Sequence, residues 1–231
     1  MRWMAEHKRL TACVLALVLI LGCVLSVKAI RQNVAAPPLI DFTVVIDAGH
    51  GGIDGGVVGK QSGVKESHLN LIYAKLLSAQ FERAGFRTVM TREGEGGLYG
   101  APTSGFKRRD MEKRKEIIQS ANADVVVSLH MNRYGSPGRS GPQVFYQVGS
   151  AEGQKLAERI QDALNRFTGN HHAALAGDYY VLRVSDCPAV IVECGFLSNA
   201  QEEALLQQSD YQAELVNVIF DGIMLYLYGV T

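Results

Sequence analysis

Three short apolar runs, each followed by a charged or ionisable residue, constrain the fold of this chain more than any other feature. The runs are Val44–Ile46, Val125–Leu129 and Ala189–Val192. Such nearly uninterrupted apolar runs are typical of strands in a parallel sheet that is covered by helices on both faces. Because helix-like segments lie between the runs, the sequence predicts an α/β fold: a single domain with a mostly parallel or mixed sheet of about six strands and helices on both faces.

The periodicity of the apolar residues places the individual elements. Strands are expected at Phe42–Asp47, Phe86–Thr91, Asp124–Leu129, Gln143–Gln147, Tyr179–Arg183 and Ala189–Glu193. Helical spacing predicts helices over Ser67–Ala84, Lys107–Ala121, Gln154–Phe167 and Asp210–Tyr228. Ser209, followed by Gln212, predicts a capping box at the start of the last helix.

The N-terminal segment has a different character from the rest of the chain. Leu10 to Val27 is free of charge, and Arg2, Lys8 and Arg9 precede it. A run of about 18 apolar residues can span a bilayer, whereas the core of a signal peptide has about 7–15 residues. The length favours an uncleaved membrane anchor over a cleaved signal segment within residues 1–31. Residues 32–40 then form a linker, and residues 41–231 form the folded domain.

The charge of the chain argues against one class of partner. Lysine and arginine together number 23, aspartate and glutamate also number 23, and the formal net charge is zero. Both signs are mixed along the chain, whereas nucleic-acid binding usually needs a clustered basic face. We therefore expect no nucleic-acid partner.

Two histidines and one glutamate stand at the ends of predicted strands. His50 follows the first apolar run in a glycine-rich turn, His130 ends the second run, and Glu193 ends the third. The carboxyl ends of strands in an open α/β sheet are where ligands bind. Glu66, just before a helix, adds a further carboxylate. Catalytic zinc takes about three protein ligands such as histidine and glutamate and leaves one position open, and a nearby carboxylate can move protons.

Each of these residues also has a purely structural interpretation. A lone histidine after a strand is usually structural, but two at equivalent strand ends favour a shared site. Glu66 could be an acid that the helix dipole favours at a helix start. A buried carboxylate at Glu193 is costly without a partner. If Glu193 faces the site, the alternation of a strand turns Cys194 toward the core.

Three further polar residues have weaker claims to a function. Asp47 could accept a hydrogen bond from His50 and so orient it, or it could only satisfy the glycine turn. Asn132 could contact a substrate or cap a loop. His68 lies near Glu66 in the sequence, but we expect it on the solvated face of the helix.

Four segments together resemble the zinc-dependent N-acetylmuramoyl-L-alanine amidases of the amidase 3 type. The segments are residues 44–56, 63–67, 125–132 and 189–199, and the resemblance extends from about Phe42 to Tyr228. It implies a zinc-exopeptidase-like fold in which His50, Glu66 and His130 hold one Zn²⁺ per chain and Glu193 is catalytic. The segment 105–109, the short chain and the single N-terminal apolar run are similar to the germination-specific branch of this family.

This resemblance implies an enzyme that hydrolyses the amide between N-acetylmuramic acid and L-alanine in peptidoglycan. In the germination-specific branch, that reaction belongs to spore-cortex maturation and precedes formation of muramic δ-lactam. Peptidoglycan and the membrane are then the expected partners, with a possible accessory protein. The domain would work outside the cytoplasm, in the space between the spore membranes for a sporulation enzyme. Two alternatives remain open: a zinc peptidase of related fold, and a non-catalytic wall-binding protein tethered to the membrane.

Overall fold

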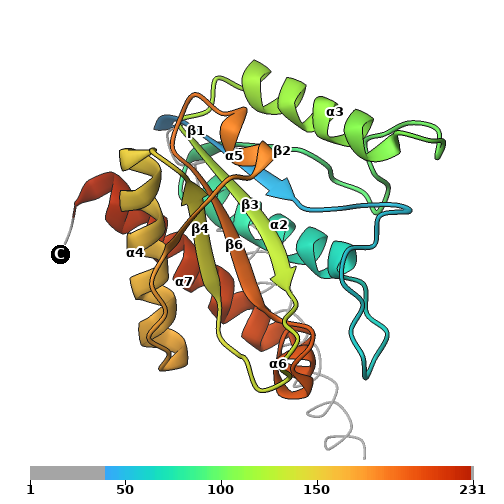
Figure 1. Cartoon of the computed structure of the whole chain (residues 1–231). Helices are drawn as coiled ribbons and strands as arrows, with labels where there is room; N and C mark the ends of the chain where they lie inside the picture. Colours follow the sequence, from blue (N-terminus) through green and yellow to red (C-terminus); the bar gives the residue numbers. More distant parts are fainter. Residues whose placement is uncertain (1–39, 230–231) are drawn as a thin grey trace, which may run out of the picture. The chain divides into compact units, whose positions relative to one another are not determined.

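The computed structural model describes residues 40–229, which fold around one mixed sheet (Figure 1). The strands are β1 (Ile40–Ala48), β2 (Phe86–Met90), β3 (Val125–Asn132), β4 (Gln143–Gln147), β5 (Leu175–Gly177) and β6 (Ala189–Phe196). Their order across the sheet is β2-β1-β3-β6-β4-β5. Strands β2, β1, β3 and β6 are parallel, whereas β4 pairs antiparallel with β6 and parallel with β5. The predicted six-stranded mixed sheet is confirmed.

Helices cover both faces of this sheet, as the apolar strands predicted. The helices are α2 (Glu66–Arg83), α3 (Phe106–Ser120), α4 (Ala151–Thr168), α5 (Tyr180–Arg183), α6 (Ala200–Leu205) and α7 (Ser209–Tyr228). Figure 1 shows α3 and α5 on one side and α2, α4 and α7 on the other. A large apolar layer lies beneath α2, α4 and α7, and a smaller one lies beneath α3 and α5.

The alternation of side chains along a strand decides which residues face the smaller layer. In β6, Val192 and Cys194 belong to the large layer, whereas Ile191 belongs to the small one. Successive strand side chains point to opposite faces, so Glu193 lies on the same face as Ile191. Cys194 is fully buried, which agrees with its predicted direction. Polar strand residues therefore gather beneath α3 and α5, while the opposite face is an apolar core.

The sixth strand is not where the sequence predicted it. The prediction of a strand at Tyr179–Arg183 is wrong, because this segment contains the short helix α5 and the sixth strand is β5. In α5 both Val181 and Leu182 are buried in the small layer. A strand would turn these two neighbours to opposite faces, so packing of both residues on one layer selects a helical turn.

The predicted capping box of the last helix is also wrong. Helix α7 begins at Ser209, but its N-cap is Gln208, without a side-chain hydrogen bond. Gln212 Nε2 instead donates to the Leu206 carbonyl at 2.9 Å. Gln212 is thus used to satisfy the end of α6, a helix that the sequence analysis did not predict. The side chain of Asn199 caps the start of α6 by accepting from the Gln201 and Glu202 amides.

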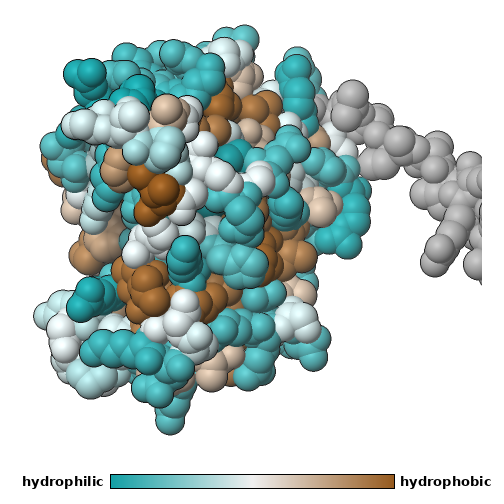
Figure 2. All heavy atoms as spheres, turned by 90° about the vertical axis from the view of Figure 1, so that its right-hand side faces the viewer, coloured by the Kyte–Doolittle hydropathy of each residue, from teal (hydrophilic) through white to brown (hydrophobic). Residues whose placement is uncertain are grey.

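The outer surface of the domain is mixed in character. On the face drawn in Figure 2, hydrophobic patches are separated by hydrophilic side chains. Within residues 40–229, no helix is both long and apolar enough to span a membrane. The predicted anchor or signal segment, and all but the last residue of the predicted linker, lie outside the described residues.

Candidate metal centre

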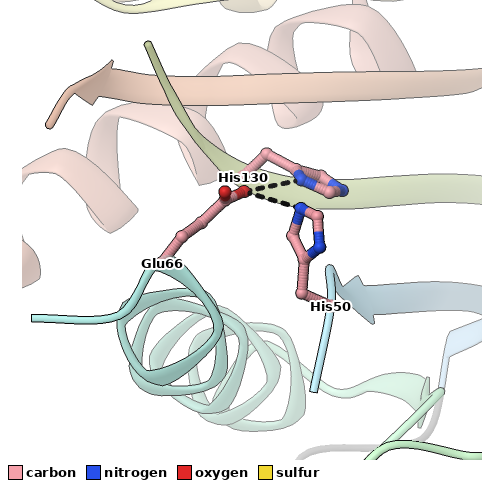
Figure 3. Close-up of side chains that lie close together, drawn as sticks. All are labelled: His50, Glu66 and His130. Atoms are coloured by element: carbon pink, nitrogen blue, oxygen red, sulfur yellow. Dashed lines mark hydrogen bonds and ion pairs between the residues drawn. The ribbon is translucent and has the colours of Figure 1, made fainter. Parts of the chain in front are cut away.

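Three side chains from distant segments meet at one point, as Figure 3 shows. Glu66 Oε1 lies 3.2 Å from His50 Nε2 and 2.9 Å from His130 Nδ1. One potential ligand atom from each residue lies within 4.8 Å of the other two. Tetrahedral zinc with bonds of about 2.0–2.1 Å would place its ligand atoms about 3.4 Å apart. The structure therefore brings the three predicted ligands together at a spacing that suits a small metal ion.

His50 is held in place by an unusual turn after β1. It has a left-handed backbone with φ of 60°, a conformation that is uncommon outside glycine. A Cβ at the preceding Gly49 would overlap the ring of His130. Glycine at this position thus lets the His130 ring pack directly against the turn that presents His50.

Buried arginines hold the main chain of the same turn. Arg114 Nη2 donates to the His50 carbonyl at 2.5 Å, and Arg114 Nη1 donates to the Ala48 carbonyl at 2.8 Å. Arg92 Nη2 donates to the carbonyls of Gly49 at 3.0 Å and Ser67 at 2.7 Å. Arg92 therefore ties the turn to the first residues of α2. No sequence signal indicated that these arginines would be buried.

Glu66 is the first residue of α2 and is almost completely buried. Its Oε2 accepts from the Val57 amide at 2.7 Å, and its Oε1 accepts from the Met131 amide at 3.2 Å and from Asn70 Nδ2 at 3.3 Å. A Cβ at Gly56 would overlap this carboxylate. Burial works to raise the pKa of Glu66, but hydrogen bonds with His130 and His50 hold it well below its usual range. Glu66 is thus an ionised carboxylate in a fixed orientation.

Glu193 lies next to this trio but does not share its hydrogen bonds. It is the register partner of His130 across the parallel strands β3 and β6, so both side chains point to the face beneath α3 and α5. Within residues 40–229, Glu193 Oε2 is buried and has no hydrogen-bond partner. Burial, with a smaller contribution from the charge of Glu66, raises the pKa of Glu193 to about 7 against the opposing charges of His130 and His50.

Besides Glu66, the acid that contacts His50 is Asp54 rather than Asp47. Asp54 Oδ2 lies 3.1 Å from His50 Nδ1, behind the nitrogen that faces Glu66. Burial works to lower the pKa of His50, but Glu66 and Asp54 raise it above its usual value. The signal that could have found Asp54 is its place four residues after His50 in the same glycine-rich turn.

Asp47 belongs to a buried ion-pair network instead. Its carboxylate accepts from Ser128 Oγ at 2.5 Å and from Thr91 Oγ1 at 2.6 Å, and it pairs with Arg114. The prediction that Asp47 orients His50 is therefore not matched by its contacts. The physical reason is the register of the sheet, which places Asp47 directly opposite Ser128 in β3.

The other two polar candidates, Asn132 and His68, bond to groups outside the trio. Asn132 Oδ1 accepts from the Arg133 amide at 2.7 Å, so the side chain caps the loop after β3, which is one of its two predicted roles. His68 is half exposed and pairs with Glu95 at 2.8 Å, as expected for the solvated face of α2. Asn70, which sequence analysis missed, is fully buried and also donates to the Gly49 carbonyl at 3.1 Å.

A pocket of about 280 Å³ opens beside His50, His130 and Glu193. Residues of α3, among them Phe106 and Lys107, form one wall, and the residues in and before α5 form another. The site therefore combines three clustered ligand atoms, a buried unpaired carboxylate and an adjacent cavity.

Comparison with known proteins identifies the family. A family model described as N-acetylmuramoyl-L-alanine amidase matches residues 44–224 of the chain. The chain belongs to this family of enzymes. It is 34% identical over 194 residues to the germination-specific N-acetylmuramoyl-L-alanine amidase of Bacillus subtilis, a match that covers 82% of this chain and 81% of that protein.

Solved amidase structures have the same fold. The CwlD amidase from Clostridioides difficile, solved in complex with the GerS lipoprotein, is 34% identical, and the TM-score is 0.79 over 82% of this chain and 100% of that one. The catalytic domain of CwlV, an amidase from Bacillus (Paenibacillus) polymyxa, is 31% identical, with a TM-score of 0.71 over 80% of this chain and 98% of that one. The N-acetylmuramoyl-L-alanine amidase that the sequence analysis expected is thus confirmed at the level of family, fold and enzyme class.

Proposed function

We propose that this amidase uses one Zn²⁺ per chain, held by His50, Glu66 and His130, and that Glu193 is its catalytic proton carrier. The observation that carries the proposal is Glu193 Oε2, which is buried without a hydrogen-bond partner among residues 40–229, beside three clustered ligand atoms. The bond to be hydrolysed is the amide between the lactyl group of N-acetylmuramic acid and L-alanine.

The residues present fit a zinc ion. Two imidazole nitrogens and one carboxylate oxygen are a donor set of catalytic zinc sites. One nitrogen of each imidazole faces the same oxygen, Glu66 Oε1. Asp54 contacts His50 Nδ1, the ring nitrogen that does not face Glu66. An acceptor at this position fixes the tautomer of a metal-binding histidine. When bound, zinc would supply Lewis acidity toward the scissile carbonyl and toward water.

Glu193 would perform the proton transfers of the reaction. It accepts a proton from the attacking water and returns it to the nitrogen of the departing L-alanine. In the metal-free protein Glu193 has a pKa of about 7 and so exists in both protonation states near neutral pH. A group that acts first as a base and then as an acid must be able to take both states.

Substitution of His130 tests the metal part of this proposal. Because the three ligands come from different segments, His130→Ala should lose most of its zinc while the domain keeps its circular dichroism spectrum. Full zinc occupancy in His130→Ala would remove His130 from the ligand set.

The reaction products test the enzyme class. Wild-type protein with zinc should release intact stem peptides from muropeptides. Release of single amino acids would indicate a peptidase, and binding without cleavage would indicate a wall-binding protein.

We further propose a role in spore-cortex maturation outside the cytoplasm, in the step that precedes formation of muramic δ-lactam. The support is the similarity to the germination-specific amidase of Bacillus subtilis. An accessory protein is part of this proposal, since the similar CwlD amidase was solved in complex with the GerS lipoprotein. Deletion of the gene should leave spores whose cortex lacks muramic δ-lactam, and a normal content of the lactam would contradict this role.

The proposed attachment to the membrane rests on the apolar run from Leu10 to Val27. Full-length protein should fractionate with membranes at its uncleaved mass. A soluble form that begins near Ile30 or later would show instead that the segment is a cleaved signal.

A further inference from the structure

Carboxylates outnumber lysines and arginines in the pocket beside the three ligands. The acids that line it are Asp47, Asp54, Asp110 and Glu193, whereas the lysines and arginines that line it are Lys107 and Arg114. Stem peptides are themselves acidic, because they carry free carboxylates. Like charges at short range repel, so a substrate carboxylate that lies in this pocket away from the metal needs a cation among the side chains.

Arg114 is not available for that purpose. Its side chain is 2% exposed. Its Nε donates to Asp110 Oδ2 at 2.7 Å, and its two terminal nitrogens bond to Asp47 and to the carbonyls of Ala48 and His50. Four of its five N–H donors are therefore used by groups of the fold itself, and a ligand that displaced any of these groups would disturb the turn that presents His50.

Lys107, in contrast to Arg114, is exposed and available to a ligand. Its side chain is 68% exposed, and its Nζ lies 3.5 Å from Asp54 Oδ2. That distance is longer than a normal charge-assisted hydrogen bond of about 2.7–2.9 Å. The ammonium group therefore retains donors for an incoming anion, on a flexible stem at the rim of the pocket.

The position of Lys107 fits a carboxylate close to the scissile amide. The Asp54 carboxylate alone stands between Lys107 and His50, at 3.5 Å from Lys107 Nζ and 3.1 Å from His50 Nδ1. Two extended residues span about 7 Å. A free carboxylate on the second residue of a stem peptide is thus within reach of Lys107 when the amide before the first residue lies at the metal centre.

We propose that Lys107 binds the free carboxylate of the second stem residue and makes the enzyme prefer acidic stems over amidated ones. The inference rests on the proposed amidase function of the same site. Lys107 acts here by contact with substrate, and its contact with Asp54 is exchanged for contact with the substrate carboxylate.

The test compares two muropeptide substrates that differ at one group. In one the second stem residue carries a free α-carboxylate, and in the other that group is a carboxamide. Zinc-loaded wild-type enzyme should have a kcat/KM about 1.5- to fivefold higher for the acidic substrate, the range expected for a largely exposed ion pair. Lys107→Gln should abolish this preference, mainly through a higher KM for the acidic substrate, because the contact is made equally in the ground and transition states.

Two control variants separate this role from a structural one. Lys107→Arg should keep the preference, and Lys113→Gln should match wild type, since Lys113 is an exposed lysine of the same helix that pairs with Glu116. Equal losses on both substrates, or weaker zinc binding in Lys107→Gln, would show that Lys107 only supports Asp54 and would overturn the inference. Absence of a preference in wild type would also overturn it. If wild type cleaves neither substrate at the muramoyl amide, the proposed function itself fails.

Discussion

Two carboxylates on the same face of the sheet, Asp47 in β1 and Glu193 in β6, have opposite environments. Asp47 in β1 accepts from Ser128 and Thr91 and pairs with Arg114, and these partners lower its pKa to about 2 against the effect of burial. Glu193 in β6 has an oxygen without a partner among the described residues, and burial raises its pKa to about 7. The difference teaches that burial alone does not mark a catalytic acid. The supply of hydrogen-bond donors separates an acid that stabilises the fold from one that remains free for chemistry.

The largest expected effect is on catalysis at Glu193. Glu193→Gln keeps the shape of the side chain but cannot accept a proton, so turnover should fall by about 10²–10⁴-fold. Zinc content, measured on the same preparation, should stay at the wild-type value. Loss of zinc together with activity would make Glu193 a ligand and would remove the contrast with Asp47.

Removal of the Asp47 charge should act on stability. Asp47→Asn breaks the buried pair with Arg114 and leaves Asp110 as its remaining carboxylate partner, and breaking a buried pair costs about 3–5 kcal/mol. Denaturant unfolding should show this loss in the free energy of unfolding. Asp41→Asn is the matched control, because Asp41 lies in the same strand with a fully exposed side chain. Unchanged stability in Asp47→Asn would mean that Asp110 alone can satisfy Arg114.

A third acid, Asp54, should have an intermediate role. Because it contacts His50 behind the metal-facing nitrogen, Asp54→Asn should weaken zinc affinity by about 10–100-fold. Competition with a chromophoric chelator measures this affinity, and Asp221→Asn in α7 is an exposed control. Wild-type affinity in Asp54→Asn would show that Arg114 and the glycine turn are sufficient to orient His50.

The smallest effect concerns pH and sharpens the contrast between the two acids. The folded pKa of Glu193, about 7, is above its reference value of 4.5, so its favourable contribution to stability is present below pH 4.5 and is lost as the pH rises through about 7. Asp47, with a folded pKa of about 2 against 3.8, stabilises the fold above pH 3.8, and this contribution is lost as the pH falls through about 2.

Metal-free protein allows the two acids to be distinguished. Glu193→Gln should melt at a higher temperature than wild type above pH 7, by about 2–4 °C for each kcal/mol, and the difference should shrink below pH 4.5. Calorimetry in the presence of a chelator measures it. A difference independent of pH would mean that the ionisation of Glu193 is not the cause.

The sequence predicted the features that depend on local patterns. His50, His130 and Glu193 could be assigned to one site because each follows an apolar run, although β3 and β6 continue past His130 and Glu193 to Asn132 and Phe196. The alternation of a strand was enough to assign Cys194 to the core. The family resemblance added the order of the segments and the identity of Glu66 as a candidate ligand. These predictions needed no knowledge of how distant segments pack.

The features that were missed depend on tertiary packing. Arg114 and Arg92 are long charged residues of a type that is usually exposed, and only the folded chain shows that they hold the main chain around His50. The partners of Asp47 could not be predicted, because the register between β1 and β3, which pairs Asp47 with Ser128, cannot be read from either strand alone. The helix α5 was read as a strand because its aromatic and β-branched residues favour strands in isolation.

The pairing of His130 with Glu193 across two parallel strands also governs which changes in chain length the protein can tolerate. The residues between β3 and β6 include exposed loops, where insertions and deletions alter little. A shift of β6 by a single residue would exchange the directions of Glu193 and Cys194, since one step of register moves every side chain to the other face. The acid would then be turned into the apolar layer and the thiol toward the metal centre. We therefore expect length variation among descendants of this sequence to accumulate in the loops, while the spacing from the start of β6 to Glu193 stays constant.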